Sequence, residues 1–292
     1  MSTPAFPASR AAVESTGAVF DLRPTTGSTN ADLLDAAPTL PDGSVVVTLD
    51  QTAGRGRLDR TWTAPAGQTL AASLLVRAPL DDRDRGWLPL VAGAAMRDAV
   101  RAALEPVPDD VPDQVPDDVP DQAPDDVPDA ADTSRASRAT VKWPNDVLVD
   151  GRKICGILCQ VAADGSVVVG AGVNLTIPEA DLPTPTSTSL AASGATGDAG
   201  TLADAVLSAF WTGVREAVVA LAGGGAAAEA VRSHVRAGCG TIGARVRLEL
   251  PDGSVVEADA TGIDDEGRIT IRDQDGSSRG VAVGDVTHLR YA

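Results

Sequence analysis

Residues 141–175 read VKWPNDVLVDGRKICGILCQVAADGSVVVGAGVNL, and this stretch decides the fold. It contains three apolar runs, VKWPNDVLV, KICGILCQV and SVVVGAGVNL, each of a length and composition typical of a β-strand. Asp150-Gly151 and Asp164-Gly165 lie at the two joins, and an Asp-Gly pair between apolar runs is a strong hairpin signal. The stretch therefore predicts three strands of an antiparallel meander.

Helical patterns surround this meander. Apolar residues recur at helical spacing between Leu88 and Ala103 and again between Val206 and Leu221. A further helix should begin at Ser28-Thr29-Asn30, which are good N-cap residues, and end before Pro38. Strands and helices in this arrangement indicate an α+β domain, in which helices cover a mixed or antiparallel sheet.

The two ends of the chain differ from the central part in their sequence patterns. From Thr241 onward, short strand patterns alternate with turns rich in Asp and Gly, which is typical of a small β-barrel. We therefore expect a main domain over residues 16–238 and a β module over 239–292. Residues 1–15 lack a clear pattern and are expected to form a flexible tail.

Residues 108–131 form a four-residue repeat of the type Pro-Asp-(Asp/Gln)-(Val/Ala). Proline at every fourth position blocks helices and central strands, and the aspartates repel one another, so we expect a disordered insert over about residues 106–135. The repeat is a tolerated surface insertion or, less favoured, an interaction tail. It also contributes much of the negative charge.

The composition limits location and partners. The 292 residues carry a formal net charge of −17, which argues against a nucleic-acid partner. No stretch approaches the roughly 20 apolar residues of a membrane span, and the N-terminus does not resemble a secretory signal, so we expect a cytoplasmic protein with no membrane partner. Cys155 and Cys159 are about 13 Å apart along a strand, too far for a disulfide, and are expected to be buried.

Three segments carry polar groups suited to a ligand. In residues 50–62, DQTAGRGRLDRTW, two glycines alternate with two arginines, which suits a phosphate loop or a solvated basic turn. Lys142 lies in an apolar strand end and needs an anion, either a ligand or an aspartate. Asn174 follows Gly170 and Gly172, and capping a turn is favoured over binding a ribose or a phosphate.

Together these segments resemble the biotin–protein ligases. The motifs GSTN (27–30), QTAGRGR (51–57), KWPND (142–146), KICGIL (153–158) and GAGVN (170–174) occur in the order and spacing of that family. The segment GDVTHLR (284–290) also resembles the end of the family's small SH3-like domain. The resemblance covers nearly all of the chain except residues 1–15 and the acidic insert.

The resemblance implies a class II synthetase-like core and a C-terminal SH3-like β-barrel. It implies that ATP, with Mg²⁺, activates biotin to biotinyl-5′-AMP and that biotin is then transferred to a lysine of a biotin carboxyl carrier protein or of the biotin domain of an acyl-CoA carboxylase. We expect a monomer or weak homodimer. Asp59 departs from the glycine that many relatives have, so the mobility of this loop is expected to differ.

The resemblance also assigns residues by position. Lys142 and Arg57 would be catalytic, and no metal ligands are assigned. The biotin-binding set is Ser28, Thr29, Asn30, Gln51, Gly54, Arg55, Gly56, Arg57 and Lys142. The adenylate-binding set is Arg55, Arg57, Trp62, Lys142, Asn145 and Asn174.

Three other functions compete with this interpretation. A lipoate–protein ligase would share the core but not the combination of GRGR, KWPND and a β module. A biotin-responsive DNA-binding repressor would need a winged-helix domain, for which we expect no room ahead of Ser28. A biotin-binding scaffold without catalysis would not need the lysine and arginines.

Overall fold

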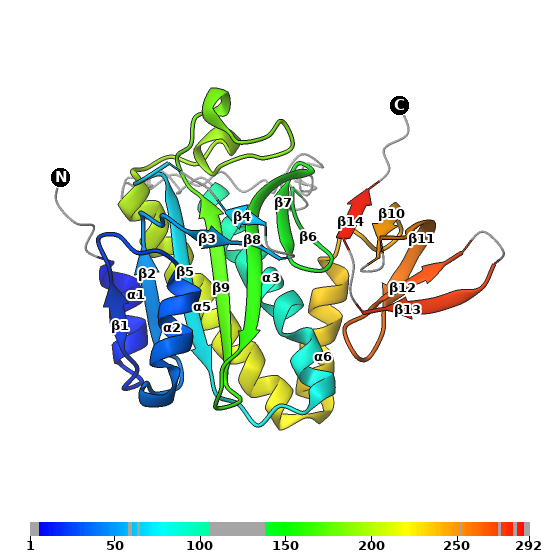
Figure 1. Ribbon diagram of the computed structural model, residues 1–292, viewed down its shortest axis with the longest axis horizontal. Helices are drawn as coiled ribbons and strands as arrows, with labels where there is room; N and C mark the ends of the chain where they lie inside the picture. The colour runs from blue at the N-terminus through cyan, green and yellow to red at the C-terminus, as the bar shows by residue number, and fades with distance from the viewer. Residues whose placement is uncertain are drawn as a thin grey trace, which may run out of the picture.

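A computed structural model of the chain shows a helix-covered sheet with a smaller sheet beside it (Figure 1). The large sheet has seven strands in the order β1-β2-β5-β9-β8-β7-β6. The β1–β2 pair is parallel, and the other neighbours are antiparallel. The structure describes residues 6–57, 60–62, 65–105, 138–250, 253–273, 276–282 and 285–288.

The strands of the large sheet follow the predicted patterns. Both faces of the sheet are covered, so every residue of β5 is buried. The strands of this sheet are β1 (Phe20–Leu22), β2 (Val45–Thr48), β5 (Thr69–Val76), β6 (Ala139–Lys142), β7 (Asp146–Val149), β8 (Arg152–Val161) and β9 (Val167–Asn174). A separate two-stranded hairpin consists of β3 (Gly54–Arg55) and β4 (Thr61–Trp62).

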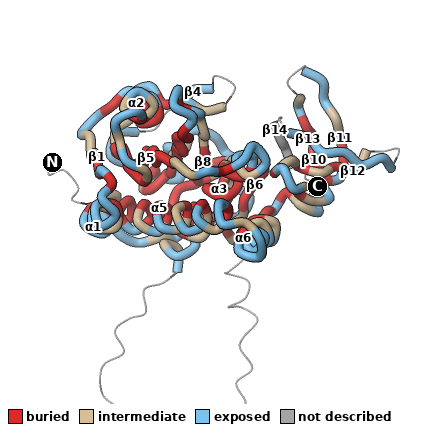
Figure 2. The backbone as a smooth tube through the Cα atoms, turned by 90° about the horizontal axis from the view of Figure 1, so that it is seen from below, coloured by how far each residue is buried: buried red, intermediate tan, exposed pale blue. Residues whose placement is uncertain are grey.

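The helices lie on both faces of the sheet. Figure 2 shows α2 on one side and α1, α5 and α6 on the other. On the α2 side, Leu33 packs with Val46, Leu75 and Val168, whereas alternate strand residues belong to the larger cluster on the opposite side. The helices are α1 (Pro7–Glu14), α2 (Thr29–Ala36), α3 (Asp82–Leu104), α5 (Ala199–Gly223) and α6 (Gly225–Ala237), with short 3-10 turns at Ala37–Thr39, Glu179–Asp181 and Ala191–Ser193.

The predicted helices near Ser28, Leu88 and Val206 are confirmed as α2, α3 and α5. Ser28 is the N-cap of α2, and its hydroxyl accepts a hydrogen bond from the Ala31 amide at 3.4 Å. The helix ends at Ala36, before Pro38, as expected.

The prediction of one strand through VKWPNDVLV is wrong. The run forms two antiparallel strands, β6 and β7, which reverse direction at residues 143–145. Pro144 explains the break because proline cannot donate to a central sheet ladder. The reversal places Lys142 directly opposite Asp146 on the neighbouring strand, and this pairing shapes the site described below.

The prediction of a flexible tail over residues 1–15 is wrong for its described part. Residues 7–14 form α1, which packs on α5, and Phe6, Ser9 and Val13 are buried. Asp204 of α5 explains this order, because its carboxylate accepts hydrogen bonds from the amides of Ala8 and Ser9 at 2.9 and 2.8 Å. Residues 1–5 and 106–137, including the acidic repeat, lie outside the described part of the chain, as does Asp59.

Helix α5 also departs from the expectation about membrane spans. By length and composition alone, α5 is long and apolar enough to cross a membrane. Its apolar residues, however, pack in the core with α3, and Arg215 forms an ion pair with Asp42. Helix α5 is therefore the central helix of the layer beneath the sheet.

The C-terminal residues form the expected small β module. Its five antiparallel strands have the order β13-β12-β11-β10-β14, and Val246, Leu248, Ala258, Ile269 and Ile271 form its buried face. The strands are β10 (Arg245–Glu249), β11 (Val255–Ile263), β12 (Ile269–Arg272), β13 (Ser278–Val281) and β14 (Asp285–His288). The module lies beside α6 and β6 (Figure 1).

The docking of α1 gives a testable prediction. We expect Asp204→Ala to lower the free energy of unfolding by about 2–3 kcal/mol, because it removes a charged acceptor from two buried donors, the Ser9 amide and hydroxyl, and from the partly buried Ala8 amide. Urea unfolding measures the change, and Asp181→Ala, at an exposed aspartate, is the matched control. Equal stability of both variants would show that Asp204 does not hold α1.

Candidate functional site

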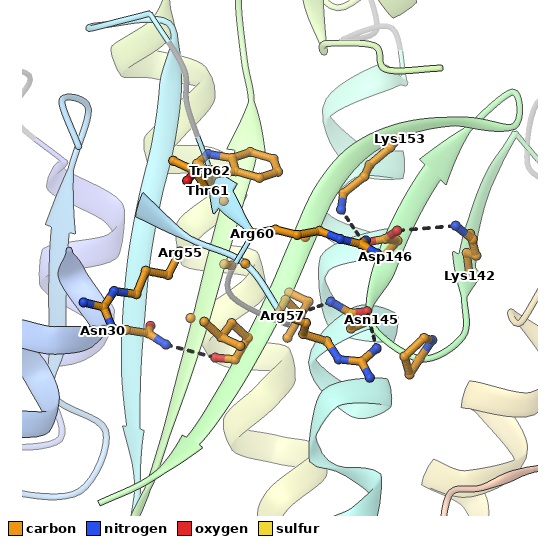
Figure 3. A pocket seen from close by; sticks show the side chains of 18 of the residues that line it. Asn30, Arg55, Arg57, Arg60, Thr61, Trp62, Lys142, Asn145, Asp146 and Lys153 are labelled. Atoms are coloured by element: carbon orange, nitrogen blue, oxygen red, sulfur yellow. Dashed lines mark hydrogen bonds and ion pairs between the residues drawn. The ribbon is translucent and has the colours of Figure 1, made fainter. Parts of the chain in front are cut away.

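A cavity of about 320 Å³ opens beside the start of α2, between the β3–β4 hairpin and strands β8 and β9 (Figure 3). Its size lies in the range of small-molecule sites. Ten of the residues predicted from the sequence line it: Ser28, Thr29, Asn30, Gln51, Arg55, Gly56, Arg57, Trp62, Lys142 and Asn145. Gly54 and Asn174 do not line it.

One end of the cavity carries the neutral polar side chains of α2 and Gln51, and Figure 3 shows Arg55 on the same side as Asn30. The side-chain oxygen of Gln51 accepts hydrogen bonds from the Thr29 amide at 2.9 Å and from the Thr29 hydroxyl at 3.2 Å. This arrangement orients the Gln51 side chain and leaves its NH₂ group to donate elsewhere.

The side-chain amide of Asn30 forms its hydrogen bonds with other groups of the protein. Its side-chain oxygen accepts from the Ser73 hydroxyl at 2.6 Å, and its NH₂ group donates to the Leu158 carbonyl at 3.1 Å and to the Gln160 side chain at 2.8 Å. A Cβ atom at Gly170 would lie 2.0 Å from the Asn30 oxygen. The structure therefore gives Asn30 a role in joining α2 to β8, and its amide hydrogens are already used.

Trp62 lies over two strands where they carry glycine. A Cβ atom at Gly172 would approach the Trp62 indole to 2.9 Å, and one at Gly156 would lie 3.6 Å from it. The indole nitrogen is buried with no hydrogen-bond partner among the described residues, so it has a donor to offer a ligand. Gly54 supports this arrangement, because a Cβ atom there would lie 2.6 Å from both the Gln51 amide nitrogen and the Trp62 carbonyl oxygen.

The other end of the cavity is organised by Asp146. Its carboxylate lies 2.5 Å from the Lys153 ammonium and 3.6 Å from the Lys142 ammonium. Figure 3 shows both lysine side chains pointing toward it. Burial is the main cause that lowers the pKa of Lys142, and Lys153 adds to it, whereas Asp146 acts in the opposite direction. Of the two interpretations left open by the sequence for Lys142, the pairing with an aspartate is confirmed; Lys142 also lines the cavity, and its ligand role stays a prediction.

Arg57, in the Gly-Arg segment 54–57, lies at the same end of the cavity as Asp146. The guanidinium of Arg57 donates to the Asn145 side-chain oxygen at 3.1 Å, and the Asn145 NH₂ group donates to the Ile157 carbonyl at 2.8 Å. Burial lowers the pKa of Arg57. Asn145 therefore connects the loop to β8.

The lining has a strong positive surplus. Six basic side chains, Arg55, Arg57, Arg60, Lys142, Lys153 and Arg247, and two carboxylates, Asp146 and Glu249, line the cavity. The chain as a whole has a net charge of −17, so its overall sign does not describe this site. A low-dielectric cleft with a surplus of four positive charges attracts anions such as phosphates and carboxylates.

Asn174 lies away from the cavity. It is 3% exposed, and its NH₂ group donates to the Thr188 carbonyl at 2.8 Å. The Thr188 amide in turn donates to the carbonyl of Lys153, also at 2.8 Å. The Asn174 side chain therefore joins the end of β9 to a segment 14 residues further along the chain. This is neither the local turn cap favoured from the sequence nor a contact with the cavity, and the adenylate-binding role of Asn174 stays a prediction.

Sequence reasoning missed Lys153, Asp146, Arg60, Arg247 and Glu249. Lys153 belongs to KICGIL, and a cation beside the buried run Ile154-Cys155 was a signal of the same kind as Lys142. Arg247 and Glu249 carry no such signal, because they alternate with buried residues of β10 as any exposed strand residues do. In the described part of the chain, no three His, Cys, Asp or Glu side chains form a metal-binding cluster.

Comparison with known proteins supports this picture. The model of the Biotin/lipoate A/B protein ligase family matches residues 22–176, and that of the Biotin protein ligase C terminal domain matches residues 241–289. The biotin–[acetyl-CoA-carboxylase] ligase of Mycobacterium tuberculosis is 38% identical over 275 residues, which are 93% of this chain and 89% of that protein.

Solved structures share the fold. A biotin protein ligase from Aquifex aeolicus, in complex with biotin and ATP, aligns with a TM-score of 0.64 at 20% identity over 94% of this chain and 99% of that one. The biotin protein ligase from Leishmania major, in complex with biotinyl-5-AMP, aligns with a TM-score of 0.58 at 22% identity over 90% and 98% of the two chains. The predicted fold class is confirmed, and the chain belongs to the Biotin/lipoate A/B protein ligase family.

Proposed function

We propose that this chain is a biotin–protein ligase, which activates biotin with ATP and transfers it to a lysine of a carrier protein. The main support for this proposal is the cavity. Neutral hydrogen-bonding groups of α2 and Gln51 lie at one end, and Lys142 and Lys153 lie with Asp146 at the other. Biotin has the matching shape: a neutral ureido ring at one end and a carboxylate at the other. The proposal agrees with the activity named for the relative from Mycobacterium tuberculosis.

The neutral end favours biotin over lipoate. A ureido group offers one strong acceptor and two donors, which can pair with the Gln51 amide and the hydroxyls of Ser28 and Thr29. The dithiolane ring of lipoate has no carbonyl to accept from the Gln51 NH₂ group and no N–H donors, and a buried polar group left unpaired costs about 1–3 kcal/mol. Recognition groups of this kind reject analogues that lack the matching atoms.

The charged end suits adenylate formation. A biotin carboxylate oxygen attacks the α-phosphorus of ATP, a new O–P bond forms, and the bond to the bridging oxygen breaks as pyrophosphate leaves. Two anions must approach each other in this step. Lys142, Lys153 and Arg57 offset their repulsion, and such preorganised charge stabilises the transition state.

Transfer uses the same cations. The neutral amine of the acceptor lysine attacks the biotinyl carbonyl, the C–O bond to AMP breaks, and the amine loses a proton.

The adenine would pack near Trp62, whose indole is already fixed against Gly172. The loop that carries Arg55 and Arg57 lies over the cavity (Figure 3) and would keep water from the mixed anhydride.

Magnesium fits the site as a companion of the nucleotide. Asp146 and Glu249 are the carboxylates of the cavity lining, and Asp146 already contacts two lysines. Mg²⁺ commonly binds one or two protein carboxylates together with substrate phosphates and water. The two carboxylates of the cavity lining would provide ligands of this kind and number. When bound, the ion would neutralise the departing pyrophosphate.

We further propose that the acceptor is a biotin carboxyl carrier domain, as the name of the Mycobacterium tuberculosis relative indicates for that protein. We place the reaction in the cytoplasm. All three cysteines are free, which suits a reducing compartment. Cys155 is buried as expected, whereas Cys159 is only half-buried.

ATP–pyrophosphate exchange tests the proposed function. We expect the purified chain to catalyse exchange that depends on biotin, with lipoate at least 100-fold less effective at equal concentration. Omission of both acids is the blank. Exchange supported equally well by lipoate would indicate the sister activity, and binding of biotin without exchange would indicate a scaffold.

The pair of lysines on Asp146 gives a second prediction. We expect Lys153→Ala and Lys142→Ala each to lower the rate of adenylate formation by roughly 100- to 1000-fold, because each removes a cation from the transition state. Arg152→Ala is the matched control, since Arg152 precedes Lys153 but pairs with Glu179 on the surface. A folded Lys153→Ala variant with near-normal exchange would remove Lys153 from the mechanism.

A further inference from the structure

The turn between β11 and β12, residues 263–267, is bound on several sides by the ligase domain. The Trp87 indole donates to the Asp265 carbonyl at 2.8 Å, and the guanidinium of Arg83 donates to the same oxygen at 3.0 Å. Arg236 donates to the Ile263 carbonyl at 3.0 Å. We call residues 263–267 the docking turn.

The docking turn and α3 also interlock through two glycines. A Cβ atom at Gly86 would lie 2.4 Å from the Glu266 carbonyl oxygen, and one at Gly267 would lie 2.8 Å from the Gly86 carbonyl oxygen. Gly267 also has a positive φ of 77°, which favours glycine. Backbones at such a separation tolerate no side chain between them, so the relative position of α3 and the turn is narrowly defined.

Trp143 connects the docking turn to the cavity, because it contacts the turn and lies next to Lys142 in the chain. The Trp143 side chain is 1% exposed, and its indole nitrogen donates to the Gly267 carbonyl at 3.1 Å. The Trp143 amide donates to the Thr241 hydroxyl at 3.0 Å, a second contact with the start of the β module. Trp143 lies between Lys142 and the Pro144-Asn145 turn, so its position sets the position of both neighbours.

The docking turn is itself well ordered by local bonds. The Asp264 carboxylate accepts from the amides of Glu266 and Arg268, each at 3.0 Å, and pairs with the Arg268 side chain at 2.7 Å. A turn held in this way can act as a fixed support. A shift of the support by 1 Å would move Lys142 and Asn145 relative to the reacting groups, and misplacement of this size can cost 100-fold in rate.

We propose that the docking turn of the C-terminal module positions the KWPND segment for adenylation, with Trp143 as the positioning residue. This inference rests on the proposed function and extends it. Trp143 also lines the cavity, between Lys142 and Asn145, and its proposed action is to position these two neighbours. The groups for the ureido ring lie on α2 and at Gln51, at the other end of the cavity. Loss of the support should therefore affect the chemical step much more than biotin binding.

Two substitutions remove the support by different means. Trp143→Phe keeps an aromatic ring and deletes the N–H donor to Gly267. Gly86→Ala leaves the cavity lining unchanged and inserts a methyl group between α3 and the Glu266 carbonyl. Gly223→Ala is the matched control, because it is also a glycine in a helix but has no atom within 4 Å of the added Cβ.

The readouts are the kcat and ATP KM of biotin-dependent exchange, the Kd for biotin, and the melting temperature. We expect Trp143→Phe and Gly86→Ala each to lower kcat by about 10- to 100-fold while the biotin Kd stays within about threefold and Gly223→Ala matches the wild type. Because both act through one turn, the double variant should lose less than the product of the two single effects.

A merely structural role would lower the melting temperature and leave the kcat of the folded fraction unchanged, and this outcome would overturn the proposal. Independent, fully multiplicative effects in the double variant would also overturn it, because the two residues would then act by separate routes. Absence of biotin-dependent exchange in the wild type would instead reject the proposed function, so the two failures are distinguishable.

Discussion

The contact of one carboxylate with two ammonium groups underlies the site. Lys142 and Lys153 come from neighbouring parts of the sheet, and a partly buried pair of cations would be unstable without an anion between them. Asp146 provides that anion because the chain reverses at Pro144 and places Asp146 opposite Lys142. The same carboxylate holds both cations at the end of the cavity where a ligand's phosphate would lie, so the site is charged and ordered before any ligand arrives.

The rest of the fold gives this pair its surroundings. Glycines on β8 and β9 leave room for the Trp62 indole over the sheet, and Asn30 joins α2 to β8, so the cavity has fixed walls at both ends. The helix layer beneath buries the opposite face of the sheet. The small β module contributes Arg247 and Glu249 to the lining, so the complete cavity belongs to both domains.

The sequence predicted the fold well where local chemistry is decisive. Asp-Gly turns and a serine N-cap specify hairpins and a helix start through a few neighbouring residues, and these predictions are confirmed. The sequence did not predict features that depend on contacts between residues far apart in the chain. Residues 7–14 form a docked helix whose partners lie far along the chain: Asp204 accepts from its first amides, and Val13 is buried in the core. Lys153 was overlooked because its importance follows from the register that brings it to Asp146. The adenylate-binding role of Asn174 stays a prediction, and its side-chain NH₂ group is used inside the fold.

We infer that the lysine pair on Asp146 forms, before any ligand binds, the site for the reacting carboxylate and phosphate. A crystal structure of the chain with a non-hydrolysable biotinyl-adenylate analogue tests it most directly. We expect the ammonium groups of Lys142 and Lys153 within about 3.2 Å of phosphate or carbonyl oxygens of the analogue, with the ureido ring beside Gln51. An analogue whose phosphate lies elsewhere, with both lysines still paired only to Asp146, would contradict the account.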